Sequence, residues 1–134
     1  MQKELVTIDV KPGARMETQS GIANQWPKIY GAIVRAETKR AAAIVMHPAS
    51  NFMGHYLLEP LARAGVTMLG LNSRYVGNDS QLLMERVIQD LGAGVRYLRD
   101  QGYERIVLIG NSGGAALMSF YQSQAERPVI THTP

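Results

Sequence analysis

A serine at the apex of a glycine-rich turn is the residue of this chain best placed to do chemistry. Ser112 lies within the sequence Gly110-Asn111-Ser112-Gly113-Gly114. A serine hydroxyl is a weak nucleophile, so an enzyme that uses one needs a base to take its proton and donors to stabilise the oxyanion. The pattern G-x-S-x-G between a strand and a helix is typical of a nucleophile elbow, and it predicts covalent acyl chemistry.

The residues on either side of this turn supply the elements that must position the serine. A strand predicted over Arg105–Ile109 enters the turn, and a helix predicted from Ser112 to about Gln124 leaves it. Glycines stand two positions before and after the serine, where a side chain would collide with the closely packed strand and helix. The amide of Gly113 then faces the developing oxyanion from the helix N-terminus, and Asn111 is expected to line the site.

Two other roles for the turn have to be weighed against the elbow. The first is structural: Ser112 caps the following helix in a glycine-rich connection and does no chemistry. The second is a phosphate-binding turn, but the spacing G-x-G-x-x-G and the ending G-K-[ST] are both absent around it. The apolar run before the serine and the helix after it favour the elbow.

The rest of the chain predicts an α/β fold. Two short apolar runs, Ala41–Met46 and Val66–Leu71, are typical of strands buried on both faces. A helix that ends at Ala64 separates them, and a second helix is predicted over Gln81–Arg99. This alternation of strand and helix implies right-handed crossovers and a mostly parallel sheet with helices on both faces.

The first third of the chain predicts two further strands. They cover Leu5–Val10 and Tyr30–Glu37 and would form an antiparallel edge of the sheet. The loop before the long helix holds three polar residues that favour a helix N-cap: Asn78, Asp79 and Ser80.

The composition narrows the classes of protein to which the chain can belong. Its 134 residues, 46% apolar and 19% charged, suffice for one domain with a substantial core. The net charge is +3 and the basic residues are scattered, so neither nucleic acid nor a membrane is an expected partner. No apolar run approaches the ~20 residues that span a bilayer. The lack of cysteine excludes disulfides and fits the cytoplasm, which is the predicted location.

Three segments together resemble the α/β-hydrolase family. The elbow at residues 110–114 is the most specific of them. The segment His47-Pro48-Ala49-Ser50 follows a buried strand, as the family's His-Gly-x segment follows its third strand, although Pro48 stands where the family has glycine. Residues 65–79 are similar to the family's fourth strand and the loop after it. The likeness covers roughly residues 30–124.

The resemblance implies roles for these residues. Ser112 is the nucleophile, and the backbone amides of Gly113 and Ala49 form the oxyanion hole, with Ser50 as a second candidate donor. His47 has the position of a structural histidine that lines the site. The family's acid and catalytic histidine follow later strands, and these have no counterpart within residues 1–134. No metal or organic cofactor is expected.

Other titratable residues are weaker candidates for an acid or base. His55 and His132 are the remaining histidines, and each is expected to have no catalytic role. Asp90 and Asp100 fall on the polar face of the predicted long helix, where they are expected to contact water. Asp79 is expected to cap that helix, while Arg74 and Tyr75, in the same loop, are expected at the surface.

Residues 1–134 are therefore expected to be the N-terminal part of a single α/β-hydrolase domain. The predicted reaction is hydrolysis of a carboxylic ester or related acyl bond of a small molecule, through an acyl-enzyme on Ser112. A segment beyond residue 134, in the same chain or a separate one, would supply the acid and the histidine. Residues 1–134 alone would then be inactive. The alternative is a hydrolase-like binding module without catalysis.

Overall fold

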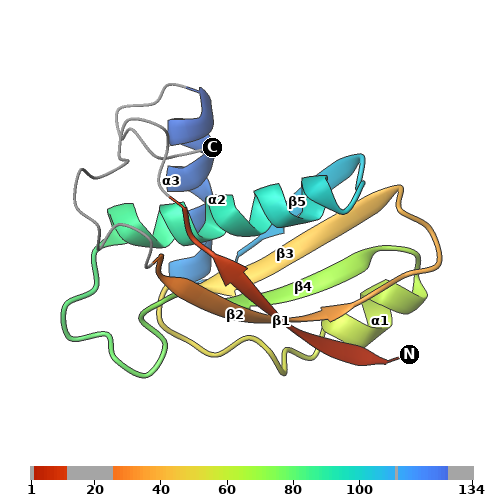
Figure 1. The fold of residues 1–134 in the computed structure, drawn as a ribbon, viewed down its shortest axis with the longest axis horizontal. Coiled ribbons are helices and arrows are strands. Elements are labelled where there is room, and N and C mark those ends of the chain that lie inside the picture. The colour runs from red at the N-terminus through yellow and green to blue at the C-terminus, as the bar shows by residue number, and fades with distance from the viewer. Residues whose placement is uncertain (1, 12–25, 111, 127–134) are drawn as a thin grey trace.

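The computed structural model describes residues 2–11, 26–110 and 112–126, which form one mixed sheet and its covering helices (Figure 1). The strands are β1 (Lys3–Asp9), β2 (Lys28–Val34), β3 (Ala41–His47), β4 (Thr67–Asn72) and β5 (Arg105–Ile109). The helices are α1 (Leu58–Arg63), α2 (Met84–Asp100) and α3 (Gly113–Glu126). The predicted α/β fold is confirmed, and every predicted strand and helix is present within a few residues of its expected bounds.

The sheet has the strand order β1-β2-β4-β3-β5. Strand β3 pairs in parallel with β4 on one side and with β5 on the other. Strands β1 and β2 pair antiparallel with each other, and β2 pairs antiparallel with β4. The parallel part therefore holds the apolar runs identified in the sequence, and the first two strands form the expected antiparallel edge.

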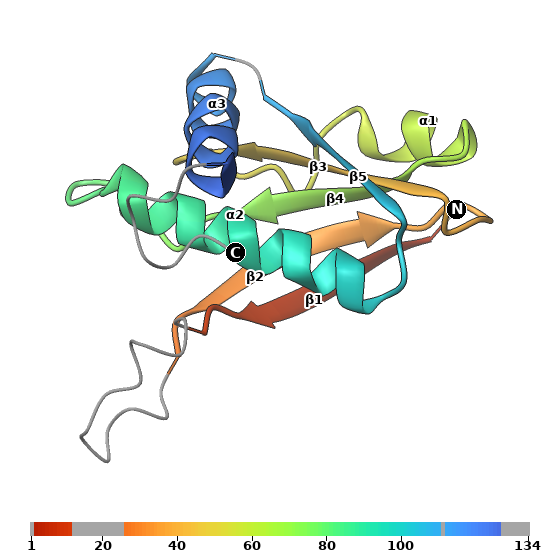
Figure 2. The same cartoon turned by 90° about the horizontal axis from the view of Figure 1, so that it is seen from above.

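Helices cover both faces of the sheet: Figure 1 shows α2 and α3 on one side and α1 on the other, and Figure 2 shows α2 crossing in front of the sheet. Alternate residues of β3 divide between two apolar clusters because successive side chains of a strand point to opposite faces. Ile44 and Met46 belong to the larger cluster, under α2 and α3, while Ala43 and Val45 belong to the smaller one, under α1. Strand β3 thus has a buried side chain on both faces, as its apolar sequence predicts.

The sequence predicts the end of α1 correctly but not the start of α2. Helix α1 ends before Gly65, whose φ of 107° is the left-handed conformation expected just past a helix end. The predicted cap of α2 by Asn78, Asp79 or Ser80 is wrong. The N-cap of α2 is Leu83, without a side-chain hydrogen bond, because residues before it form turns.

Within the described parts of the chain, no helix is both long enough and apolar enough to cross a membrane.

Candidate active site

Ser112 has the backbone conformation of a strained turn. Among the residues that the structure describes, it alone combines a side chain with a positive φ, at 57°. This left-handed conformation is uncommon for a residue with a Cβ, and residues held in it occur frequently at active sites. Ser112 is exposed, and α3 begins at the next residue. Strand β5, the strained turn and α3 thus present a serine at the surface beyond the carboxyl end of the sheet.

The three glycines of the turn allow the chain to pack more closely than any side chain would permit. A Cβ on Gly110 would lie 2.2 Å from the carbonyl oxygen of Gly114, and a Cβ on Gly114 would lie 2.5 Å from that of Met46. A Cβ on Gly113 would lie 2.8 Å from Nε2 of His47. The collision predicted for side chains at the first two positions is confirmed. Asn111 lies outside the described residues.

His47 ends β3 and lies against this turn, because β3 and β5 are parallel neighbours with their carboxyl ends at the same end of the sheet. Its Nδ1 accepts hydrogen bonds from the backbone amides of Ala49, at 3.1 Å, and Ser50, at 3.2 Å. A ring nitrogen that accepts two N–H groups carries no proton, so the neutral imidazole carries its proton on Nε2, the atom beside Gly113. The structure thus brings together His47, Ala49, Ser50 and the turn.

The loop that follows His47 is attached to the end of β4. Asn72 Oδ1 accepts a hydrogen bond from the amide of Phe52 at 2.8 Å, and Asn72 Nδ2 donates to Asn51 Oδ1 at 3.1 Å. Gly70 leaves space for this loop, since a Cβ there would lie 2.2 Å from the carbonyl oxygen of Phe52. These contacts join residues about twenty positions apart, and no local sequence pattern predicts them.

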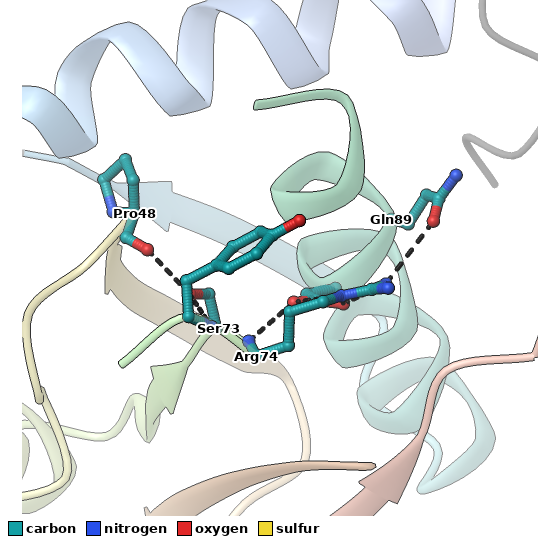
Figure 3. A network of polar contacts seen from close by, with 6 residues as sticks. Pro48, Ser73, Arg74 and Gln89 are labelled. Carbon is teal, nitrogen blue, oxygen red and sulfur yellow. Dashed lines mark hydrogen bonds and ion pairs between the residues drawn. The ribbon is translucent and has the colours of Figure 1, made fainter. Parts of the chain in front are cut away.

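A second set of contacts joins the same loop to α2 (Figure 3). Ser73 Oγ donates a 2.6 Å hydrogen bond to the carbonyl oxygen of Pro48 and accepts one from the amide of Tyr75 at 3.0 Å. The next residue, Arg74, forms an ion pair with Asp90 of α2, with Nη2 donating to Oδ1 at 2.8 Å. Its backbone amide donates to Oδ2 of the same carboxylate, also at 2.8 Å.

The prediction that Asp90 contacts water on the polar face of the helix is wrong. Its side chain is fully buried, and the Arg74 side chain is only 15% exposed. Burial raises the pKa of the Asp90 carboxyl above its ordinary value, although the Arg74 hydrogen bonds act in the opposite direction. Asp90 shares the buried side of α2 with Val87 and Gly94, three residues before it and four after it.

Of the other titratable candidates, His55 adjoins the loop, because its ring centroid lies 4.8 Å from that of Phe52 and its amide donates to the Phe52 carbonyl oxygen at 3.2 Å. Nδ1 of His55 accepts a hydrogen bond from the amide of Leu57 at 3.2 Å, and its ring stacks on Tyr56. Asp79 and Asp100 are exposed, while His132 lies outside the described residues. No cluster of three or more potential metal-binding side chains occurs within the described ranges.

Comparison with known proteins identifies the fold. No family model matches this chain, and no curated protein matches it. Among solved structures, the chain is similar to a putative hydrolase from Agrobacterium vitis S4, with a TM-score of 0.64 and 16% sequence identity. The similarity covers 94% of this chain and 46% of the other, so the chain spans about half the length of that protein. The two proteins share a hydrolase-like fold over this half.

Proposed function

We propose that this chain carries the nucleophile side of a serine hydrolase of the α/β-hydrolase type, which acts on a carboxylic ester or related acyl bond. The observation that carries the proposal is the positive φ of Ser112 in a turn whose glycines admit no side chain. A cap or simple connection needs no such strain, whereas a nucleophile held out beyond a sheet does.

In the proposed reaction, the hydroxyl oxygen of Ser112 attacks the substrate carbonyl carbon and gives up its proton to a base. Charge then develops on the carbonyl oxygen. The amide of Gly113, at the N-terminus of α3, is the first donor to that oxyanion, supported by the helix dipole. Collapse of the tetrahedral intermediate expels the alcohol or other leaving group, and water later hydrolyses the acyl-enzyme.

The second oxyanion donor is proposed to be Ala49, with Ser50 as the alternative. Both amides point to Nδ1 of His47 in this structure, at distances of 3.1 and 3.2 Å. For either amide to serve as a donor, its bond to His47 would have to be shared with, or exchanged for, one to a substrate oxygen beside Gly113. His47 and Asn111 would line the same site.

The base and its acid are proposed to come from a segment beyond residue 134. His47 is a poor base because the two amides bonded to Nδ1 leave the proton on Nε2, the nitrogen beside the turn. The Nδ1 of His55 likewise accepts the amide of Leu57. Among the described residues strand β5 pairs with a single neighbour, and its Val107 is 42% exposed. A further strand beside β5, from the C-terminal remainder of the domain, would cover this edge and bring the missing residues to the site.

The proposal is tested by labelling the protein, with this C-terminal portion present, with a fluorophosphonate probe and mapping the modified peptide. The probe should modify Ser112, and Ser112→Ala should abolish the label. Ser119→Ala is the matched control, because Ser119 is an exposed serine within α3 and should not affect labelling. Absence of label on Ser112 would refute the hydrolase.

One observation favours a second function, a binding module of the same fold that performs no catalysis. In both histidines of the described residues Nδ1 accepts backbone amides, which leaves the proton of the neutral ring on Nε2 and no ring nitrogen free to accept one from Ser112. Such a module would bind an acyl compound at the turn but leave Ser112 unmodified by the probe. Retention of ligand binding in the absence of labelling would support it.

A further inference from the structure

The buried ion pair of Asp90 and Arg74 has more hydrogen bonds than charge neutralisation alone requires. The Asp90 carboxylate accepts the backbone amide of Arg74 as well as two nitrogens of its guanidinium group. Gln89 Oε1 accepts a further, longer bond from Arg74 Nη2, at 3.4 Å. Figure 3 shows how this set of bonds joins α2 to the segment after β4. The carboxylate thereby fixes both the side chain and the main chain of Arg74.

Fixing the main chain at Arg74 also fixes the residue before it. The Arg74 amide belongs to the peptide unit that joins Ser73 to Arg74, so Asp90 sets the orientation of that unit. Ser73, which is 5% exposed, then directs its hydroxyl at the carbonyl oxygen of Pro48. Proline has no N–H of its own, so this carbonyl is the backbone group through which Pro48 can be held.

Pro48 is the first residue of the loop 48–52, here called the oxyanion loop because it carries the proposed second oxyanion donor. Ala49 and Ser50 follow directly, and their amides converge on His47. Asn72 holds the far end of the loop at Phe52. Two consecutive residues, Asn72 and Ser73, therefore hold both ends of the loop that carries the proposed second oxyanion donor, and Arg74 follows them directly.

We propose that Asp90 is a positioning residue for the oxyanion loop, acting through the main chain of Arg74 and the hydroxyl of Ser73 on Pro48. This inference rests on the proposed function, because it assigns the loop a part in the chemistry of Ser112. Stability is a weak reason for such a pair, since burying two charges costs about as much as their attraction returns. A set of directional hydrogen bonds, however, can hold a backbone amide within the narrow range of positions that catalysis requires.

The test uses the full natural protein and two variants that break the path at different points. Asp90→Asn removes the charge but keeps the shape of the side chain. Ser73→Ala leaves the buried ion pair intact and removes the hydroxyl that holds Pro48, so it remains informative if Asp90→Asn does not fold. Ser73→Thr keeps the hydroxyl and should restore function. Ser80→Ala is the control, because Ser80 is an exposed serine in the same region.

Two measurements are made on each folded variant. Hydrogen exchange of the amides at residues 49, 50 and 52 should accelerate about tenfold or more when the network is cut, because those amides lose protection. The rate at which a fluorophosphonate modifies Ser112 should fall about tenfold or more, since losing an oxyanion donor outright costs about 100- to 1,000-fold. Ser73→Thr and Ser80→Ala should match the unmodified protein in both.

The outcomes separate this inference from the function on which it rests. If the probe does not modify Ser112 of the unmodified protein, the proposed function fails. Faster exchange at residues 49–52 in the variants would then support only the structural part of the inference, that Asp90 and Ser73 hold the loop. If Ser112 is labelled and the variants exchange faster but react at the normal rate, the positioning role is overturned. Unchanged exchange in Ser73→Ala also overturns it.

Discussion

The two strands that flank β3 differ sharply, although both pair with it in parallel. Strand β4 is buried along its whole length, and its carboxyl end holds the neighbouring loop through Asn72 and Ser73. Strand β5 has no fully buried residue, and its outer edge has no partner strand among the described residues. A cavity of about 230 Å³ lies beside it, lined in part by Val95, Ile106, Leu108 and Tyr121.

This difference separates the candidate site into a supported side and an open side. The loop of Ala49 and Ser50 lies on the β4 side, where side-chain hydrogen bonds fix its path. Ser112 lies on the β5 side, where local backbone geometry holds the turn while the strand leading to it is only partly buried. Under the proposed function, the residues that activate the serine would lie on the β5 side.

The largest effect is expected from cutting the polar support on the β4 side. Arg74→Ala would leave the Asp90 carboxylate buried without its cation, which should lower the free energy of unfolding by about 3–5 kcal/mol. Arg63→Ala is the control, since it removes an exposed ion pair with Glu59 and should cost about 0.3–0.5 kcal/mol. Urea denaturation measures both. Equal losses would mean that the burial of the Arg74 pair has no energetic consequence.

A smaller loss is expected from a side chain in the turn on the β5 side. Gly110→Ala places a methyl group against the carbonyl of Gly114 and forces the backbone to move, at a cost of about 2–3 kcal/mol. Gly54→Ala is the matched control, because nothing lies within 4 Å of a Cβ there. Thermal denaturation should show a lowered Tm for the first variant alone. A normal Tm for Gly110→Ala would contradict the close packing of the turn.

Two valines compare the interior of the sheet with its open edge directly. Val45 is 2% exposed on β3 and Val107 is 42% exposed on β5. Val45→Ala should lower the free energy of unfolding by about 2 kcal/mol, from lost apolar burial and the cavity left behind. Val107→Ala should change it by less than about 0.5 kcal/mol in residues 1–134 alone. If a further strand covers β5 in a longer protein, the cost of Val107→Ala should rise there.

The smallest effect is expected at the opposite edge of the sheet, where Asp9 of β1 pairs with Lys28 of β2 at 2.6 Å. The hydrogen bond from Lys28 lowers the pKa of Asp9, and the same bond raises the pKa of Lys28. The stabilisation is therefore present between the ordinary values of 3.8 and 10.5 and is lost as the pH falls through the lowered pKa of Asp9 or rises through the raised pKa of Lys28.

That pair can be tested by comparing Asp9→Asn with the unmodified protein across pH. The variant should have a slightly lower Tm at pH 7, and the difference should vanish in strong acid, where Asp9 is protonated in both states. A difference in Tm that persists in acid would have to come from a contact other than the ion pair. Exposed pairs contribute little, so this comparison also sets the scale for the buried Arg74 pair.

The sequence predicts the parts of this molecule that depend on local pattern. Apolar runs at residues 41–46 and 105–109 mark the parallel strands, and the glycines around Ser112 indicate the strained turn. The residues that support the site escape prediction because their partners are distant in the chain. Asp90 reads as a polar helix residue until the loop after β4 brings Arg74, sixteen positions earlier, against it. The N-cap of α2 is missed because turns intervene.

The proposed division of the site is tested most directly by the rate at which a fluorophosphonate modifies Ser112, measured in residues 1–134 and in a protein extended beyond residue 134. The proposal predicts modification at Ser112 in the extended protein and a rate lower by several orders of magnitude in residues 1–134, because the base is proposed to lie beyond them. Equal rates in the two proteins would contradict the missing base, and no modification of Ser112 in either would contradict its role as nucleophile.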